Sequence, residues 1–306
     1  MTMLAEEVVT ARSVLEANGY RVFEPFTPGP RTYSNSSISD DLGIGVLVDV
    51  ETTGADVSKD EAIEFAGVRF HYDRISGVIR SATEWYRALE EPRVPINPDA
   101  AAVHGITAAD VRGHRFDDER VRHLFRDVDM VIAHNAAFDR PIVQRRFPFV
   151  PKLWGCSYVD VPWKAYGYDS SKLGHLLSSH TGSWFNGHNA ADDCYAAVHI
   201  LATPVASTGV YPLRDLITSM HTPRVRVFAT QTAYEQKDVL KARGYRWCDG
   251  TSADAPIRVK CWWTEVKAPE QEQEREWLIA NVYGYRSSGV SIVQRVVDPA
   301  ARFLLV

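Results

Sequence analysis

The sequence has few cysteines and no long run of apolar residues. Its 306 residues include four cysteines, and none of them belongs to a Cys-x-x-Cys pair. This spacing argues against a disulfide framework or a structural zinc site, and it favours a reducing compartment. No apolar run reaches the length of about 18 residues expected of a membrane helix, and residues 1–20 lack the apolar core of a signal peptide. We therefore expect a cytoplasmic protein with no membrane partner.

Acidic residues outnumber basic residues in this chain. The chain has 34 Lys and Arg against 39 Asp and Glu, which gives a formal net charge of -5. The charge is uneven, because residues 224–306 hold 13 Lys and Arg against 10 Asp and Glu and so carry +3. The overall balance argues against a nucleic-acid partner, but the basic C-terminal part weakens that argument.

The spacing of apolar residues predicts an α/β protein with a mixed sheet flanked by helices. The predicted strands are 45–50, 61–72, 78–89 and 130–133, and the predicted helices of the first two thirds are 1–20, 118–129, 138–147, 172–180 and 190–203. We expect four parts: a helix and linker over 1–43, a main domain over 44–205, a connector over 206–223 and a small α+β module over 224–306. No internal repeat is present.

The strongest chemical motif is Asp49-Val50-Glu51-Thr52-Thr53-Gly54, at the end of a predicted strand. Asp49 and Glu51 are two residues apart, so their side chains share one face of that strand. Two adjacent carboxylates repel each other, and a hard cation between them would relieve the repulsion. The plainer interpretation is a strand that runs into a Thr-Gly turn.

Two further acidic motifs follow strands or precede helices. His134-Asn135-Ala136-Ala137-Phe138-Asp139 follows the predicted strand 130–133, which places Asp139 near the start of a helix. His188-Asn189-Ala190-Ala191-Asp192-Asp193 places a histidine on a loop and two aspartates in a first helical turn. Each aspartate has an alternative role in stabilising a helix N-terminus, and His188 taken alone is more typical of a structural or surface residue.

Together, Asp49, Glu51, Asp139, His188 and Asp193 resemble the DnaQ-like DEDDh family of 3′→5′ exonucleases, whose members share a ribonuclease-H-like fold. The resemblance covers about residues 44–203. It includes Ile96-Asn97-Pro98 and Val103-His104-Gly105-Ile106-Thr107. A histidine five residues before the last aspartate marks this branch, whereas the sibling branch has a tyrosine four residues before it, where this chain has Asn189.

The resemblance implies a metal-dependent phosphodiester hydrolase. Two Mg²⁺ (or Mn²⁺) ions would bind Asp49, Glu51, Asp139 and Asp193, with Asp49 shared between them, and His188 would act as the general base. The resemblance also implies substrate contacts from Thr52, Thr53, His104 and Phe138. The products would be nucleoside 5′-monophosphates, released from the 3′ end of DNA in proofreading or repair.

Two alternatives stay open at this point. An RNA-trimming 3′→5′ exoribonuclease would carry the same five residues, because nothing in the motifs distinguishes ribose from deoxyribose. A polymerase-associated adaptor would bind its partner through residues 1–30 or 224–306 and retain nuclease activity. The expected partners are therefore DNA, with RNA as an alternative, and a DNA polymerase or repair protein.

Basic residues gather in two other places. Arg140, Arg145, Arg146 and Lys152 form either a phosphate-binding face or a solvated helix face. In the C-terminal module, Lys237–Trp247 and Lys260–Trp263 interleave basic and aromatic residues. That pattern is typical of single-strand binding, although tryptophans also build the cores of small domains.

Overall fold

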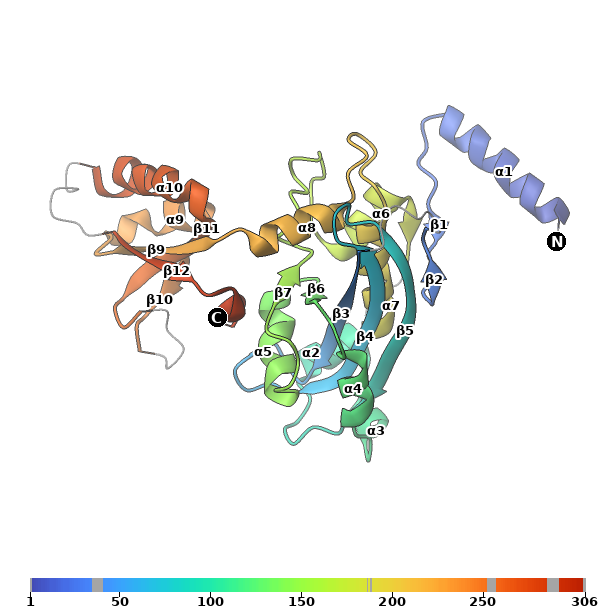
Figure 1. Cartoon of the computed structure of the whole chain (residues 1–306), viewed down its shortest axis with the longest axis horizontal. Helices are drawn as coiled ribbons and strands as arrows, with labels where there is room; N and C mark the ends of the chain where they lie inside the picture. Colours follow the sequence, from blue (N-terminus) through green and yellow to red (C-terminus); the bar gives the residue numbers. More distant parts are fainter. Residues whose placement is uncertain are drawn as a thin grey trace.

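The computed structural model describes residues 2–34, 41–185, 187, 189–251, 257–284 and 292–304, with side chains from residue 7 onward (Figure 1). The chain forms a larger α/β domain and a smaller α+β module on its C-terminal side. None of the helices in these ranges combines the length and apolar character needed to cross a membrane.

A six-stranded mixed sheet forms the larger domain, as the sequence predicts. The strand order is β2-β5-β4-β3-β6-β7. The strands are β2 (Arg31–Thr32), β3 (Leu42–Thr52), β4 (Ala62–Asp73), β5 (Ile79–Leu89), β6 (Met130–Ala133) and β7 (Trp154–Cys156). The central strand β3 runs antiparallel to β4 and parallel to β6. The predicted strands correspond to β3, β4, β5 and β6.

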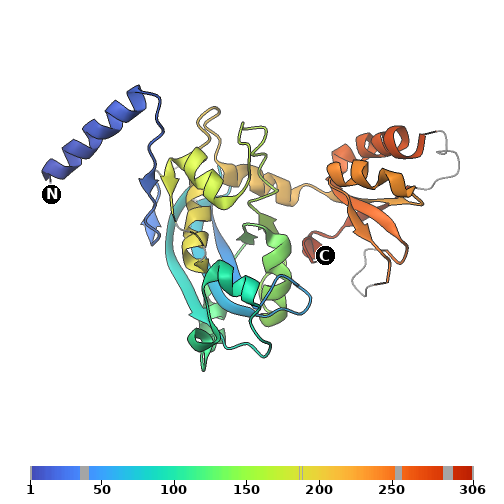
Figure 2. The same cartoon turned by 180° about the vertical axis from the view of Figure 1, so that it is seen from behind.

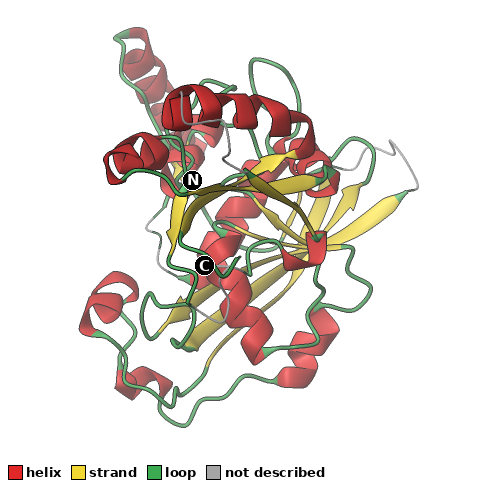
Figure 3. Ribbon diagram, turned by 90° about the vertical axis from the view of Figure 1, so that its left-hand side faces the viewer, coloured by secondary structure: helices red, strands yellow, loops and turns green. Residues whose placement is uncertain are grey.

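Helices cover both faces of this sheet (Figure 3). One face packs against α6 (Leu173–Thr181), α7 (Ala190–Ala202) and α8 (Pro212–His221), and the other against α4 (Asp118–Leu124) and α5 (Ala136–Arg146). Along β3, Val46, Val48 and Val50 are buried on the α5 side. Strand alternation therefore turns Asp49 and Glu51 toward the face that α7 covers.

Three local predictions differ from the structure. The helix expected over 118–129 ends at Leu124, because Asp127 adopts a positive φ of 56° that a right-handed helix does not allow. The expected connector contains α8, which buries Leu213 and Leu216 in the main core. The expected linker contributes β2 to the sheet, and its residues 35–40 lie outside the described ranges.

The N-terminal helix α1 (Thr2–Ala17) forms as the sequence predicts and stops before Gly19, which has a φ of +84°. It projects away from the sheet in both Figure 1 and Figure 2, and its Val8 is 63% exposed. Downstream, β1 (Glu24–Pro25) pairs with β8 (Ser183–Trp184). Helices α2 (Pro98–His104) and α3 (Ala108–Val111) lie in the connection between β5 and α4.

The C-terminal module is a four-stranded antiparallel sheet with helices on one face. Its strand order is β10-β11-β9-β12. The strands are β9 (Arg224–Thr230), β10 (Arg246–Cys248), β11 (Cys261–Lys267) and β12 (Val293–Val297). Helices α9 (Lys237–Ala242) and α10 (Gln271–Leu278) pack on Val225, Val227 and Trp262 through Leu240 and Leu278. The module is thus the small α+β unit that the sequence predicts.

Buried charges join the two parts of the chain. The Asp160 carboxylate, which follows β7, accepts hydrogen bonds from Arg224 and Arg302, each at 2.8 Å. Ser219 of α8 donates to the same carboxylate at 2.8 Å. The C-terminal turn also reaches α5, because the Arg140 guanidinium donates to the carbonyl oxygens of Ala300 and Arg302. These contacts attach the small module to the larger domain.

We predict that Asp160→Asn lowers the free energy of unfolding by about 3 kcal/mol or more, because it leaves two buried guanidinium groups short of their shared counter-charge. Chemical denaturation measures this difference. The matched control is Asp118→Asn, which removes a carboxylate that is half exposed and paired with Arg146, and should cost about 1 kcal/mol or less. Equal losses in the two variants would contradict the buried-junction account.

Candidate functional site

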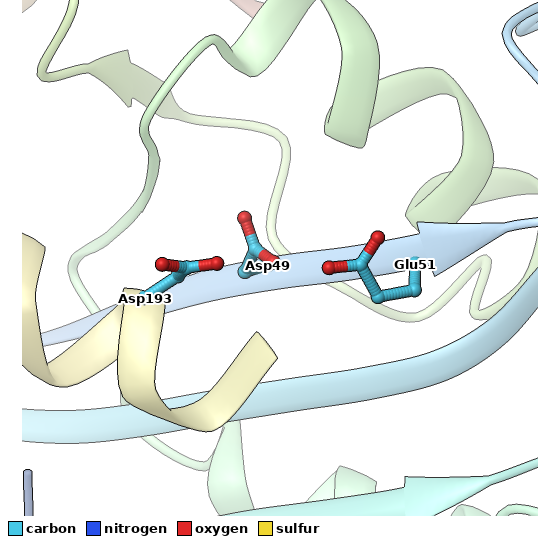
Figure 4. Close-up of side chains that lie close together, drawn as sticks. All are labelled: Asp49, Glu51 and Asp193. Atoms are coloured by element: carbon cyan, nitrogen blue, oxygen red, sulfur yellow. The ribbon is translucent and has the colours of Figure 1, made fainter. Parts of the chain in front are cut away.

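Three carboxylates converge at the end of the central strand (Figure 4). Asp49 and Glu51 come from β3, and Asp193 comes from the first turn of α7. One oxygen atom from each of the three lies within 4.8 Å of the others. All three residues are partly buried, so they share a site that solvent reaches only in part. The structure thus brings together residues that lie up to 144 positions apart in the chain.

Asp139 joins this group from the opposite layer. Because β6 runs parallel to β3, the chain leaves β6 at the same edge of the sheet where β3 ends. Asn135 then takes a φ of 98° and turns the chain into α5. Asp139 is 2% exposed, and its Oδ1 accepts a hydrogen bond of 3.2 Å from the backbone N–H of Val50. Its carboxylate is therefore fixed beside the strand residue that separates Asp49 from Glu51.

Burial and mutual repulsion raise the pKa values of these carboxyl groups. The pKa of Glu51 rises to about 7 and that of Asp139 to about 8, in each case mainly because burial disfavours the charged form. The pKa of Asp49 is raised well above its ordinary value by burial and by the charges of Asp139, Asp193 and Glu51. A bound divalent cation would reverse this effect.

The donor set fits a hard cation. All four groups are carboxylates, and oxygen ligands are those that Mg²⁺ and Mn²⁺ prefer. The raised pKa values indicate that the protein alone does not compensate the charges of Asp49, Glu51 and Asp139. The cluster Asp49, Glu51 and Asp193 is accordingly suited to hold a divalent metal, with Asp139 beside it.

Glu64 supports the site, although the sequence motifs did not identify it as a site residue. It lies opposite Glu51 in the β3–β4 pair and is 1% exposed. One carboxylate oxygen accepts from the backbone N–H of Ala190, the first residue of α7, at 3.1 Å, and the other pairs with Arg87 at 2.5 Å. Glu64 thereby fixes the N-terminal end of α7, the helix that carries Asp193. The available signal was an acidic residue between the apolar residues Ile63 and Phe65 of β4.

The loop after β3 is held by its own side chains. The Thr52 hydroxyl donates to the Gly54 carbonyl at 2.6 Å, and the Thr53 hydroxyl donates to Asp60 at 2.9 Å. His104 accepts at Nδ1 from the Ile106 N–H, so we place its proton on Nε2, which donates to the Thr52 carbonyl at 3.2 Å. The segment around His104 therefore packs on the end of β3.

The remaining predicted site residues have different surroundings. Phe138 is partly buried and packs against the core on the α5 side. His188 lies outside the described residues. Arg145 and Arg146 have partners within the protein: Arg145 donates to the carbonyl oxygens of Val57 and Asp60, and Arg146 pairs with Glu90 at 2.6 Å. Together with Arg140, which reaches the C-terminal turn, they hold segments of the protein together.

Comparison with known proteins identifies related chains. The family model RNase_T, described as Exonuclease, matches residues 46–201 and so spans all four carboxylates. Exodeoxyribonuclease 10 of Escherichia coli K12 is 28% identical over 167 residues, which cover 53% of this chain and 69% of that protein. A DNA polymerase III subunit epsilon-like protein of Rhodobacter capsulatus is 31% identical over 145 residues, which cover 44% of this chain and 19% of that protein.

Solved structures include a similar chain. It is Exonuclease X in complex with 5′ overhanging duplex DNA, which is 25% identical to this protein with a TM-score of 0.40. The match covers 56% of this chain and 99% of that one.

We predict that, in EDTA, the free energy of unfolding falls as the pH rises from about 6 to about 8. Raised pKa values mean that the folded chain binds protons more tightly than the unfolded chain, so this stabilisation is lost as Glu51 and Asp139 ionise at about 7 and about 8. Denaturant titrations at several pH values measure the slope. Asp139→Asn should reduce the slope, and added Mg²⁺ should stabilise the protein more at the upper end of the range. An unchanged slope in the variant would contradict the assignment.

Proposed function

Because the chain belongs to this exonuclease family, we propose that it is a metal-dependent 3′→5′ exonuclease that removes nucleoside 5′-monophosphates from the 3′ end of DNA. The observation that carries the proposal is the convergence of Asp49, Glu51 and Asp193 beside the buried Asp139. Such a cluster of uncompensated carboxylates is costly to fold and useful for holding cations against a phosphate. We place the enzyme in proofreading or repair.

The four carboxylates and one histidine have separate roles in the proposed reaction. Asp49, Glu51, Asp139 and Asp193 would hold two Mg²⁺ (or Mn²⁺) ions, which supply positive charge for the attacking and leaving oxygens. His188 accepts the proton of the attacking water, since an imidazole titrates near neutral pH. His188 lies five residues before Asp193 in the sequence, and Asp193 lies in the first turn of α7.

The 3′ end of the strand lies at the loop after β3. Thr52 and Thr53 use their hydroxyls to hold that loop and would place it beside the terminal nucleotide. His104 would border the pocket from the opposite segment, where its bond to the Thr52 carbonyl fixes it. Phe138 would border it from the start of α5, next to Asp139.

The relatives favour DNA as the substrate. The name of the Escherichia coli relative specifies a deoxyribonuclease, and the Rhodobacter capsulatus relative is named for a polymerase subunit. A polymerase or repair partner is therefore part of the proposal, and a pull-down with stoichiometric recovery of a polymerase tests it. All four cysteines are buried thiols outside any disulfide, which supports action in the cytoplasm.

We predict that Asp49→Asn reduces nucleotide release by about 10²–10³-fold or more, because it removes one charge of the metal-binding set. The assay follows a 5′-labelled oligonucleotide with Mg²⁺, using single-stranded DNA, duplex DNA with a 3′ mismatch, and RNA of matched sequence. The control is Asp169→Asn, an exposed aspartate outside the cluster. Wild-type release by the Asp49 variant would refute the metal site, and faster release from RNA would favour the exoribonuclease.

We predict that His188→Ala slows turnover by about 10²–10⁴-fold, the range of a lost general base, and leaves DNA binding in EDTA unchanged. Single-turnover kinetics and fluorescence anisotropy measure the two quantities. His123→Ala is a suitable control because His123 is exposed on α4. Loss of folding or of binding, instead of turnover, would assign His188 a structural role.

A further inference from the structure

The C-terminal sheet has one face that α9 and α10 leave uncovered. Strand alternation and register place Arg226 of β9, Arg246 of β10 and Arg295 of β12 on this face. We call these three residues the arginine face. Trp263 and Phe228 lie on the same side, in one row that runs from Arg246 across to β12. The helices pack on the opposite side of the sheet.

Aromatic rings support the three guanidinium groups. Arg246 lies 4.2 Å and Arg226 lies 5.5 Å from the centre of the Trp263 ring, and Arg295 lies 6.0 Å from that of Phe228. Both rings are almost fully buried, at 2% and 0% exposure. Because a guanidinium that stacks on a ring loses freedom before any ligand arrives, these cations are already ordered for binding.

Positive charge on this side exceeds the acidic charge that faces it. Glu265 is the single acidic residue among the strand positions of this face, and it pairs with Arg226 at 3.4 Å. Glu265 is also shared with Arg224 and Arg302, at 3.9 and 3.5 Å. Within the described residues, no carboxylate lies within ion-pair distance of Arg246. An anionic partner would compensate Arg246.

The burial of two of these arginines also favours an anionic ligand. It lowers the pKa values of Arg226 and Arg246, which means that their charged forms lack full compensation. The Nε atom of Arg226 is buried and lies 3.4 Å from Glu265 Oε2. The side chains of Arg246 and Arg295 remain exposed, so a ligand can reach them.

We propose that the arginine face binds single-stranded DNA. Phosphates would pair with the exposed guanidinium groups of Arg246 and Arg295, and bases would stack on the outer side of these groups, since the buried rings beneath are not accessible. The proposal rests on the exonuclease function proposed above. It assigns to the C-terminal module the task of binding the part of the strand that lies outside the catalytic site.

The position of this face suits that task. Arg224 and Glu265 stand on the same side of the sheet, and Arg224 also bonds to Asp160 of the larger domain. The arginine face therefore adjoins the buried junction between the two parts. Its side of the sheet includes Arg246 and Trp263 from the two stretches that the sequence suggested. Lys237 and Lys241 of these stretches lie on α9 instead, and Trp262 lies in the core beneath the helices.

A binding assay with the full chain tests the proposal. Anisotropy of a 5′-fluorescein-labelled thymidine 20-mer, in EDTA and over a range of NaCl concentrations, gives the affinity and its salt dependence. For the double variant Arg246→Ala/Arg295→Ala we expect Kd to rise by about 10-fold. The slope of log K against log salt should fall by about 0.7 for each lost phosphate contact. The single strand should bind more tightly than a duplex of equal length.

The matched control removes the same charge from the opposite face. Lys241→Ala/Arg275→Ala takes two cations from α9 and α10, and it should leave both Kd and the slope unchanged. Equal effects in the two double variants would show a general charge effect and overturn the proposal. Normal DNA binding by Arg246→Ala/Arg295→Ala would also overturn the proposal. The arginine face would then be assigned to an acidic protein partner.

Cross-linking of the wild-type chain covers the case in which the arginine variant does not fold. A thymidine 20-mer that contains 4-thiothymidine should cross-link to residues of β9, β10, β11 or β12, as mass spectrometry locates them. Cross-links confined to residues 44–203 would refute the proposal. Because these assays need no hydrolysis, a chain that binds DNA here but releases no nucleotide would refute only the proposed function.

Discussion

Repulsion among four carboxyl groups at the end of β3 is the constraint on which the rest of the structure depends. Burial and neighbouring carboxylates raise the pKa values of Asp49, Glu51 and Asp139, so the folded chain does not itself compensate the charges of these groups. A protein that only had to fold would avoid this arrangement. The cation and the phosphate of the proposed function would explain its presence.

Contacts with the backbone keep these groups together against their repulsion. Asp49 and Glu51 are fixed because β3 is paired on both sides, with β4 and with β6. Asp139 is held by the Val50 N–H, and Glu64 binds the first N–H of the helix that carries Asp193. The four carboxylates thus depend on three elements, β3, α5 and α7. The fold, and not attraction within the cluster, sets the geometry.

The sequence predicted the parts whose signals are local. The apolar run before Asp49 and the helical spacing before and after Asp193 both produced elements at the expected positions. Local sequence signals could not predict contacts between distant residues. Glu64 bonds to Ala190, 126 positions away, and Arg140 bonds to Ala300, 160 positions away. Helix α8 was missed because its flanking prolines are typical of a connector. The role of His188 stays a prediction.

The central claim is that the carboxylate cluster exists to bind divalent cations. Isothermal titration of Mn²⁺ into the DNA-free protein at about pH 7, in two buffers of different ionisation enthalpy, tests it most directly. Because Glu51 and Asp139 have pKa values of about 7 and about 8 without metal, binding should release about one proton or more. Binding without proton release, or no binding at all, would contradict the account.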